Sequence, residues 1–151
     1  MVTPSEQLDR RFKELRPLAD AARPARGWIR AVREALGMTT GQLAKRMKVH
    51  QPRIVELEKA EAKGNITMQS LERAAEALGC RVVYALVPLK PLTTTLQERA
   101  QQMAERQLSS VEQTMRLEAQ GVDDEEQRKR TRQRLADELL QRPARLWDDN
   151  R

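Results

Sequence analysis

The spacing of apolar residues between positions 39 and 59 constrains the fold of this chain more than any other feature. Leu43, Ala44 and Met47 recur at helical spacing, and Ile54 and Leu57 resume the pattern after a short interruption. This spacing predicts two short helices that share one small core, cross at a steep angle and are joined by a tight turn. The second helix then exposes a row of polar side chains.

Helix start and stop signals continue along the rest of the chain, which predicts a mainly α fold. Capping boxes begin at Thr3, Thr39 and Thr95, and Gly37 and Gly79 stand where helices should end. The predicted organisation is an N-terminal helix at 1–25, a helix-turn-helix domain at 26–79, a strand region at 80–91 and a helical C-terminal extension at 92–151.

The predicted strand is a run of six apolar residues that Pro88 closes. A lone strand leaves its backbone N–H and C=O groups unpaired, so we expect it to pair with the same strand of a second copy. An extended apolar tail packed on the helices is the alternative. The predicted dimerisation residues are Val82, Val83, Tyr84, Ala85, Leu86 and Val87.

The C-terminal extension begins with a long predicted helix. This helix is predicted from Thr95 to a stop at Gly121, and one of its faces is an apolar stripe. Three partners could cover this stripe: the body of the domain, a second copy of the chain or another protein. The polar segment from 122 to 151 is marginal as an isolated helix.

The net charge of +6 is concentrated around the predicted helical pair. Residues 26–64 carry nine Lys or Arg and four Asp or Glu, whereas residues 92–151 carry eleven and twelve. A basic run alone is most often a solvated surface. Because this basic run coincides with a predicted exposed helix, we expect it to bind nucleic-acid phosphates. Neutralising each phosphate would release counterions.

Several classes of protein are disfavoured by composition. The single cysteine, Cys80, gives no intramolecular disulfide and fits a reducing compartment. No apolar run approaches the roughly 20 residues of a membrane span, and the N-terminus shows no signal pattern, so we expect a cytoplasmic protein with no membrane partner. His50 is the only histidine, and no Cys/His cluster or Gly-rich phosphate loop occurs. We therefore expect no enzyme activity, no metal and no cofactor.

Residues 27–89 resemble the Xre/Cro-type helix-turn-helix family, to which phage repressors belong. The resemblance implies a five-helix, lambda-repressor-like domain that places its recognition helix in the DNA major groove. It also implies a homodimer on a palindromic operator in double-stranded DNA. The matching residues are Leu36-Gly37-Met38-Thr39, Leu43-Ala44, Val49, Ile54, Leu57-Glu58, Ile66-Thr67, Leu71, Ala74 and Ala77-Leu78-Gly79.

The resemblance also implies which side chains contact DNA. Gln51 can pair with adenine, and Arg53 can bind guanine or phosphate. Glu56 can accept from a cytosine amine or form a surface salt bridge, and both interpretations stay open. Arg33 and Glu58 occupy positions that form a structural ion pair in the family. The predicted DNA-binding residues are Thr40, Lys48, His50, Gln51, Pro52, Arg53, Glu56 and Lys59.

Three of these positions depart from the family pattern. Thr40 replaces a phosphate-binding Gln, although its hydroxyl can serve the same purpose. Lys48 stands where the turn often has Gly, so it must accept a strained geometry. Pro52 is allowed in a first helical turn but removes a polar base-reading side chain.

The whole chain resembles the bacterial family called mobile mystery protein A, through GWIRAVREALGMTTGQLAKRM, VVYALVPL and TMRLEAQGV. Members are associated with a partner similar to Fic-domain enzymes, which attach AMP to proteins. The resemblance implies an autorepressing antitoxin of a toxin–antitoxin pair; the alternative is a stand-alone dimeric phage- or plasmid-type repressor without a toxin partner. Thr114 and Glu118 match two positions of the Fic-inhibitory pattern Ser/Thr-x-x-x-Glu-Gly/Asn, and Ala119 departs from it. An ordinary solvated Thr/Glu pair is the alternative.

Overall fold

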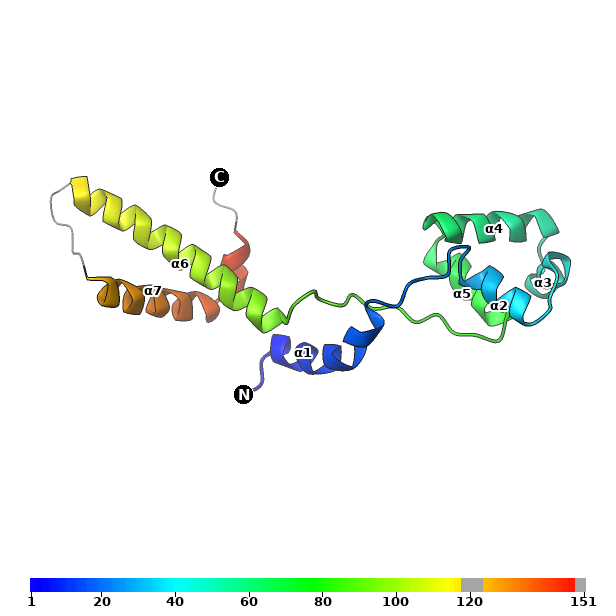
Figure 1. The fold of residues 1–151 in the computed structure, drawn as a ribbon, viewed down its shortest axis with the longest axis horizontal. Coiled ribbons are helices and arrows are strands. Elements are labelled where there is room, and N and C mark those ends of the chain that lie inside the picture. Colours follow the sequence, from blue (N-terminus) through cyan, green and yellow to red (C-terminus); the bar gives the residue numbers. More distant parts are fainter. Residues whose placement is uncertain (118–123, 149–151) are drawn as a thin grey trace. The chain divides into compact units, whose positions relative to one another are not determined.

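The computed structural model describes residues 1–117 and 124–148. Within them the chain is mainly helical, with seven α-helices, two short 3-10 helices and no strand. It divides into two compact units. Pro17–Leu86 form the insert unit, and Met1–Arg16 together with Val87–Arg151 form the hairpin unit (Figure 1). The insert unit therefore interrupts the hairpin unit along the chain.

The insert unit contains four α-helices around one core. They are α2 (Trp28–Ala35), α3 (Thr40–Met47), α4 (Gln51–Lys63) and α5 (Met68–Ala77). The predicted helical pair is confirmed, since Leu43 and Ile54 are completely buried between them. The buried core consists of Ile29, Leu43, Ala44, Met47, Ile54, Leu57, Ala74 and Leu78.

The predicted five-helix domain is not confirmed, because the N-terminal helix packs elsewhere. Helix α1 (Pro4–Leu15) belongs to the hairpin unit and packs on α6 (Leu92–Leu117). It ends at Leu15 and continues into the short 3-10 helix Arg16–Leu18, where Pro17 is incompatible with further α-helix. The apolar face of α1 was visible in the sequence, but its partner helix lies far along the chain.

Two of the three predicted capping boxes are present. The Gln42 N–H donates to the Thr39 hydroxyl at 3.1 Å, and the Thr39 N–H donates to the Gln42 side chain at 2.9 Å. Thr3 caps α1 in the same way. The box predicted at Thr95 is wrong, because α6 already begins at Leu92 and Thr95 lies inside it, donating its hydroxyl to the Pro91 carbonyl at 3.3 Å.

The N-termini of α2 and α6 are capped by carboxylates from other helices. Glu61 of α4 is buried and accepts the N–H groups of Trp28 and Ile29 at 2.5 and 2.7 Å. Asp9 of α1 accepts the N–H groups of Leu92 and Thr93 at 2.7 and 3.0 Å. A negative charge at a helix N-terminus satisfies free donors and complements the helix dipole. Each contact therefore fixes where a helix begins and ties it to a distant segment.

Antiparallel helices form the hairpin unit (Figure 1). Helix α7 (Glu125–Leu140) packs along α6, and the 3-10 helix Pro143–Trp147 packs against both. The predicted helix before Pro143 is thus present, and it is ordered by α6 within the same chain. The buried residues of this unit are Ala100, Ala104, Leu108, Ala136 and Leu146.

The strand predicted at 80–87 is absent: residues 80–88, all within the described chain, form neither strand nor helix. Val82 and Val87 are half-buried, whereas Val83, Tyr84 and Leu86 are exposed. A strand requires a ladder partner, and no ladder hydrogen bond reaches these residues from the described part of the chain. The alternative, an apolar tail packed on the helices, does not describe these exposed side chains either.

Candidate nucleic-acid interface

The turn between α3 and α4 has the geometry that a close helical crossing demands. Lys48 ends α3 in the left-handed region at φ 58° and ψ 42°, and it is the only non-glycine residue with positive φ in the described chain. This conformation costs a side-chain-bearing residue about 1–2 kcal/mol. The strained turn predicted at Lys48 is confirmed, and the strain is held by the buried side chains on both sides.

The recognition helix α4 begins with a Pro in its first turn, as predicted. His50 is the N-cap residue in an extended conformation, but its side chain makes no capping hydrogen bond and is exposed. Pro52 fits because the first helical N–H groups have no intrahelical acceptor. The His50 side chain therefore does not cap α4 and stays exposed at the start of the helix.

Polar side chains form an exposed row on α4. Gln51 donates from Nε2 to the Thr40 hydroxyl at 2.8 Å, which links the first residues of α4 and α3. Arg53 and Glu56 form an ion pair at 3.3 Å with side chains 52% and 67% exposed. An exposed pair contributes about 0–1 kcal/mol, so both groups are free to exchange partners. Lys59 is exposed two turns further along the same helix.

A buried ion pair supports this row from behind. Arg33 of α2 donates to both carboxylate oxygens of Glu58 at 2.5 and 3.3 Å, and also to the Met38 carbonyl at 2.9 Å. The hydrogen bond to Glu58 raises the pKa of Arg33, against the opposing effect of burial. The predicted structural pair is confirmed, and these two residues hold α4 in place and do not face a ligand.

Glu61 is a support of α4 that sequence reasoning missed. The sequence feature that could have indicated this role of Glu61 is Gly27, which precedes α2 with φ 88° and has no side chain for capping. A helix that begins without a local cap needs an acceptor from elsewhere. A Cβ atom at Gly27 would lie 2.8 Å from the Glu61 carboxyl carbon, so the glycine leaves room for this carboxylate.

Part of the basic excess is committed to structure. Arg46 of α3 donates to the Ala77 carbonyl at 2.8 Å, and Arg23 donates to the Ala62 carbonyl at 3.2 Å. Lys45 and Lys48 are exposed. The cations available to an anionic ligand are therefore fewer than the sequence count suggests, and they lie around the α3–α4 turn and along α4.

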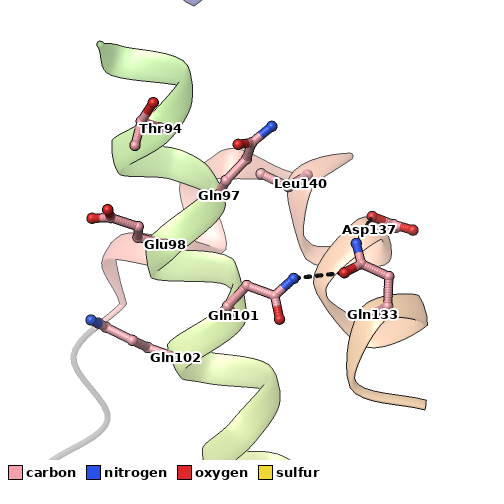
Figure 2. Close-up of a pocket in the computed structure, with 8 residues that line it drawn as sticks. All are labelled: Thr94, Gln97, Glu98, Gln101, Gln102, Gln133, Asp137 and Leu140. Carbon is pink, nitrogen blue, oxygen red and sulfur yellow. Dashed lines mark hydrogen bonds between the residues drawn. The ribbon is translucent and has the colours of Figure 1, made fainter. Parts of the chain in front are cut away.

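The hairpin unit contains a shallow groove of different chemistry (Figure 2). Gln101 of α6 donates to Gln133 of α7 at 2.9 Å, and Gln133 donates to Asp137 at 2.9 Å. Amides dominate the lining, and no group of three or more His, Cys, Asp or Glu that could hold a metal occurs in the described residues. The groove is lined by Thr94, Gln97, Glu98, Gln101, Gln102, Gln133, Asp137 and Leu140.

The two residues of the predicted inhibitory pattern fall at the end of α6. Thr114 is exposed and donates its hydroxyl to the Ser110 carbonyl at 3.1 Å. Glu118 lies outside the described residues. Val111 and Met115 lie next to Thr114 on this helix and are 53% and 38% exposed.

Comparison with known proteins supports the interface on the insert unit. Residues 29–84 match a protein-family model described as Helix-turn-helix, and the match supports a DNA-binding regulator of the Xre type. No curated protein and no solved structure gives a significant match. The resemblance of the whole chain to mobile mystery protein A receives no support from these comparisons. Among the described helices, none is both long and apolar enough to span a membrane.

Proposed function

We propose that this protein is a sequence-specific regulator that binds a palindromic operator in double-stranded DNA as a homodimer and represses its own gene. The observation that carries the proposal is the exposed polar row of α4, backed by a buried ion pair, in the part of the chain that matches the helix-turn-helix model. A rigid recognition helix with exposed Gln and Arg suits base edges in the major groove.

The contact between Thr40 and Gln51 supports a specific mode of reading. Thr40 accepts from Gln51 and keeps its own hydroxyl proton for a phosphate oxygen. Gln51 keeps its carbonyl oxygen and its second N–H, which are the two groups that pair with adenine. One phosphate contact thereby orients one base-reading side chain.

The ion pair between Arg53 and Glu56 supports a second contact. In free protein Glu56 holds the Arg53 guanidinium at 3.3 Å. On DNA, Arg53 binds guanine or phosphate, and Glu56 either accepts from a cytosine amine or keeps its salt bridge. We propose that the exposed side chains of Lys48, His50 and Lys59 contact phosphates around this centre.

The test is binding to the DNA upstream of the protein's own gene, measured by mobility shift and fluorescence anisotropy over a range of salt. We expect a retarded complex at low salt, and Arg53→Ala to weaken it by about tenfold or more, since a bidentate base contact contributes about 1–3 kcal/mol. The matched control is Arg30→Ala, which removes the same charge from α2, where Arg30 pairs with Glu34. Absence of retardation by folded protein at low salt would contradict the proposal.

A second proposed role is that of antitoxin to a Fic-type AMP-transferase, bound by the hairpin unit. The exposed pair Val111 and Met115 beside Thr114 favours a protein partner on α6. The stand-alone repressor is the alternative, and it needs no such partner.

Point variants test this role better than truncation, because α1 and Asp9 pack on α6 and deleting residues 92–151 would expose them. We expect Val111→Glu with Met115→Glu to abolish neutralisation of a co-expressed Fic-domain protein and leave DNA binding intact. The control is Gln107→Glu with Gln113→Glu, which adds the same charge at exposed positions of α6. Unchanged neutralisation by the first variant would favour the stand-alone repressor.

A further inference from the structure

Between α5 and α6, the backbone of residues 81–90 makes no hydrogen bond within the described chain. The last such bond before it runs from the Cys80 N–H to the Ala75 carbonyl at 2.8 Å, and the next N–H groups in use are those of Leu92 and Thr93. In the described chain, residues 81–90 therefore offer ten free carbonyl groups and, because Pro88 has no N–H, nine free N–H groups. Free backbone of this length is a template for strand pairing.

The side chains of this segment are apolar and exposed in the single chain. Val83, Tyr84 and Leu86 are 80%, 71% and 85% exposed. β-Branched and aromatic residues pack well across a strand pair. The first charged residues on either side are Arg81 and Lys90, and Lys90 is already paired with Glu98. An apolar strand with charged ends is complementary to a copy of itself.

We propose that two copies pair through residues 82–88 as an antiparallel two-stranded ribbon whose two-fold axis passes midway between Ala85 and Ala85 of the second copy. This inference rests on the proposed homodimer and specifies its interface. Parallel in-register pairing would set Arg81 against Arg81 of the second copy, and like charges directly opposite are destabilising. The antiparallel arrangement separates these two guanidinium groups to opposite ends of the ribbon.

The two-fold symmetry and the side-chain pattern fix the register. A two-fold axis perpendicular to an antiparallel pair keeps each residue on its own face of the ribbon. The axis must therefore pass midway between a residue and the copy of that residue on the other strand. With Ala85 opposite its copy, Val83 faces Val87 and Tyr84 faces Leu86. Val82 then faces Pro88, where a missing N–H is tolerated at the end of a ladder. Every position from 82 to 88 is thereby opposite an apolar side chain.

The native Cys80 distinguishes the two directions of pairing. In the antiparallel ribbon the two Cys80 residues are ten positions apart along the strands, or about 34 Å at about 3.4 Å per residue. In a parallel pair they face each other at a separation that a disulfide can span. Cys80 is exposed and free in the single chain.

The experiment is disulfide trapping in a glutathione redox buffer, with light scattering of the reduced protein. We expect a reduced dimer, no cross-link in the native chain through Cys80, and a cross-linked dimer for Cys80→Ser with Ala85→Cys. The collision control is Cys80→Ser with Leu36→Cys, which places a thiol at another exposed position, 59% exposed. This control should stay uncross-linked.

The outcomes separate the two proposals. A cross-link through native Cys80, or a reduced dimer that Ala85→Cys fails to trap, would overturn the antiparallel ribbon and leave the homodimer standing. A native protein that remains a monomer at high concentration, and also on its operator, would overturn the homodimer itself. Since two strands alone are marginal in water, we expect the dimer to dissociate on dilution.

Discussion

The insert unit and the hairpin unit are both small helical bodies, but they bury different side chains. The completely buried residues of the insert unit are Leu43, Ile54 and Ala74, whereas those of the hairpin unit are one leucine, Leu146, and three alanines, Ala100, Ala104 and Ala136. Burial contributes about 0.8 kcal/mol per CH₂ group, so each alanine contributes far less than a leucine. The hairpin unit brings its helices close together, but its core contributes less stability per residue.

The ion pairs of the two units also differ in burial, with the more buried pair in the insert unit. Arg33 and Glu58 in the insert unit are only 10% and 9% exposed. Arg128 and Glu105 in the hairpin unit pair across α6 and α7 with 32% and 40% of their side chains exposed. A buried pair cannot lose one member without a large penalty, whereas a half-exposed pair can. The comparison therefore predicts a rigid recognition platform and a more easily opened hairpin.

Each unit contains one tryptophan, which allows the two to be followed separately. Trp28 lies in the insert unit and Trp147 in the hairpin unit, and both rings are more than half exposed. Trp147→Phe leaves a reporter of the insert unit, and Trp28→Phe leaves a reporter of the hairpin unit. Unfolding followed by fluorescence in these two backgrounds measures each prediction below.

The largest expected effect is that of Glu58→Ala, which leaves the Arg33 guanidinium buried without its partner. Removing one member of a buried pair costs about 3–5 kcal/mol. We expect the unfolding midpoint of the insert unit to fall sharply, DNA binding to be lost with it, and the hairpin unit to change little. Glu34→Ala is the control, since Glu34 is half-exposed, pairs mainly with Arg30 at 2.8 Å and reaches Arg33 only at 4.0 Å. An equal effect of the two variants would remove the contrast between the units.

Gly27→Ala tests the carboxylate that caps α2. The glycine has φ 88° and ψ 164°, a region that other residues avoid at a cost of about 1–3 kcal/mol, and the new Cβ would meet the Glu61 carboxylate. The control is Gly37→Ala, which also has positive φ but nothing within 4 Å of the added atom. We expect Gly27→Ala to destabilise the insert unit more than the control. Equal losses would mean that the Glu61 contact adds nothing beyond backbone strain.

Acid should open the hairpin unit before the insert unit. The hydrogen bond from Arg128 lowers the pKa of Glu105 from its ordinary value of 4.5. Folded protein therefore binds this proton less tightly than the unfolded chain, and the contribution of Glu105 is present above pH 4.5 and is lost as pH falls below it. We expect the unfolding midpoint of the hairpin unit, followed by Trp147 fluorescence, to fall as the pH is lowered from 5 to 3. Glu105→Gln should make part of that decline shallower. The same slope in both proteins would exclude a role for this pair.

Local signals in the sequence predicted the insert unit better than the hairpin unit. In the insert unit, the α3–α4 pair, the capping box at Thr39 and the strained Lys48 follow from residues within a few positions of each other; in the hairpin unit only the capping box at Thr3 does so. The start of α6 was misplaced at Thr95 because its true cap, Asp9, lies 83 positions from Leu92. Helix α7 was expected to be marginal because the ion pairs that bind it to α6 connect side chains 16 to 27 positions apart.

The same distance between partners explains what was missed at the candidate site. The exposed row of α4 could be predicted because recognition residues lie together on one helix. Glu61 could not be identified as a support from spacing alone, because its partners Trp28 and Ile29 are 33 and 32 positions away. The strand predicted at 82–87 is absent from the described chain, because its composition favours a strand but no ladder partner is present.

The smallest expected effect is that of Asp9→Asn, which tests whether the distant caps of the two units are equivalent. Burial raises the pKa of Asp9, but the hydrogen bonds from Thr93 and Leu92 outweigh it and lower the pKa overall. The carboxylate is thus charged at neutral pH and holds the first turn of α6 against α1. The amide variant keeps one acceptor oxygen but loses the charge that complements the helix dipole. We expect faster hydrogen exchange at the Leu92 and Thr93 amides and little change in the unfolding midpoint of the hairpin unit.

In the insert unit, Glu61→Gln should instead lower the midpoint, because its carboxylate is buried and accepts two short hydrogen bonds. If Asp9→Asn lowered its midpoint as much as Glu61→Gln does, the hairpin unit would be as tightly fixed as the insert unit, and the expectation that its helices open more easily would be wrong.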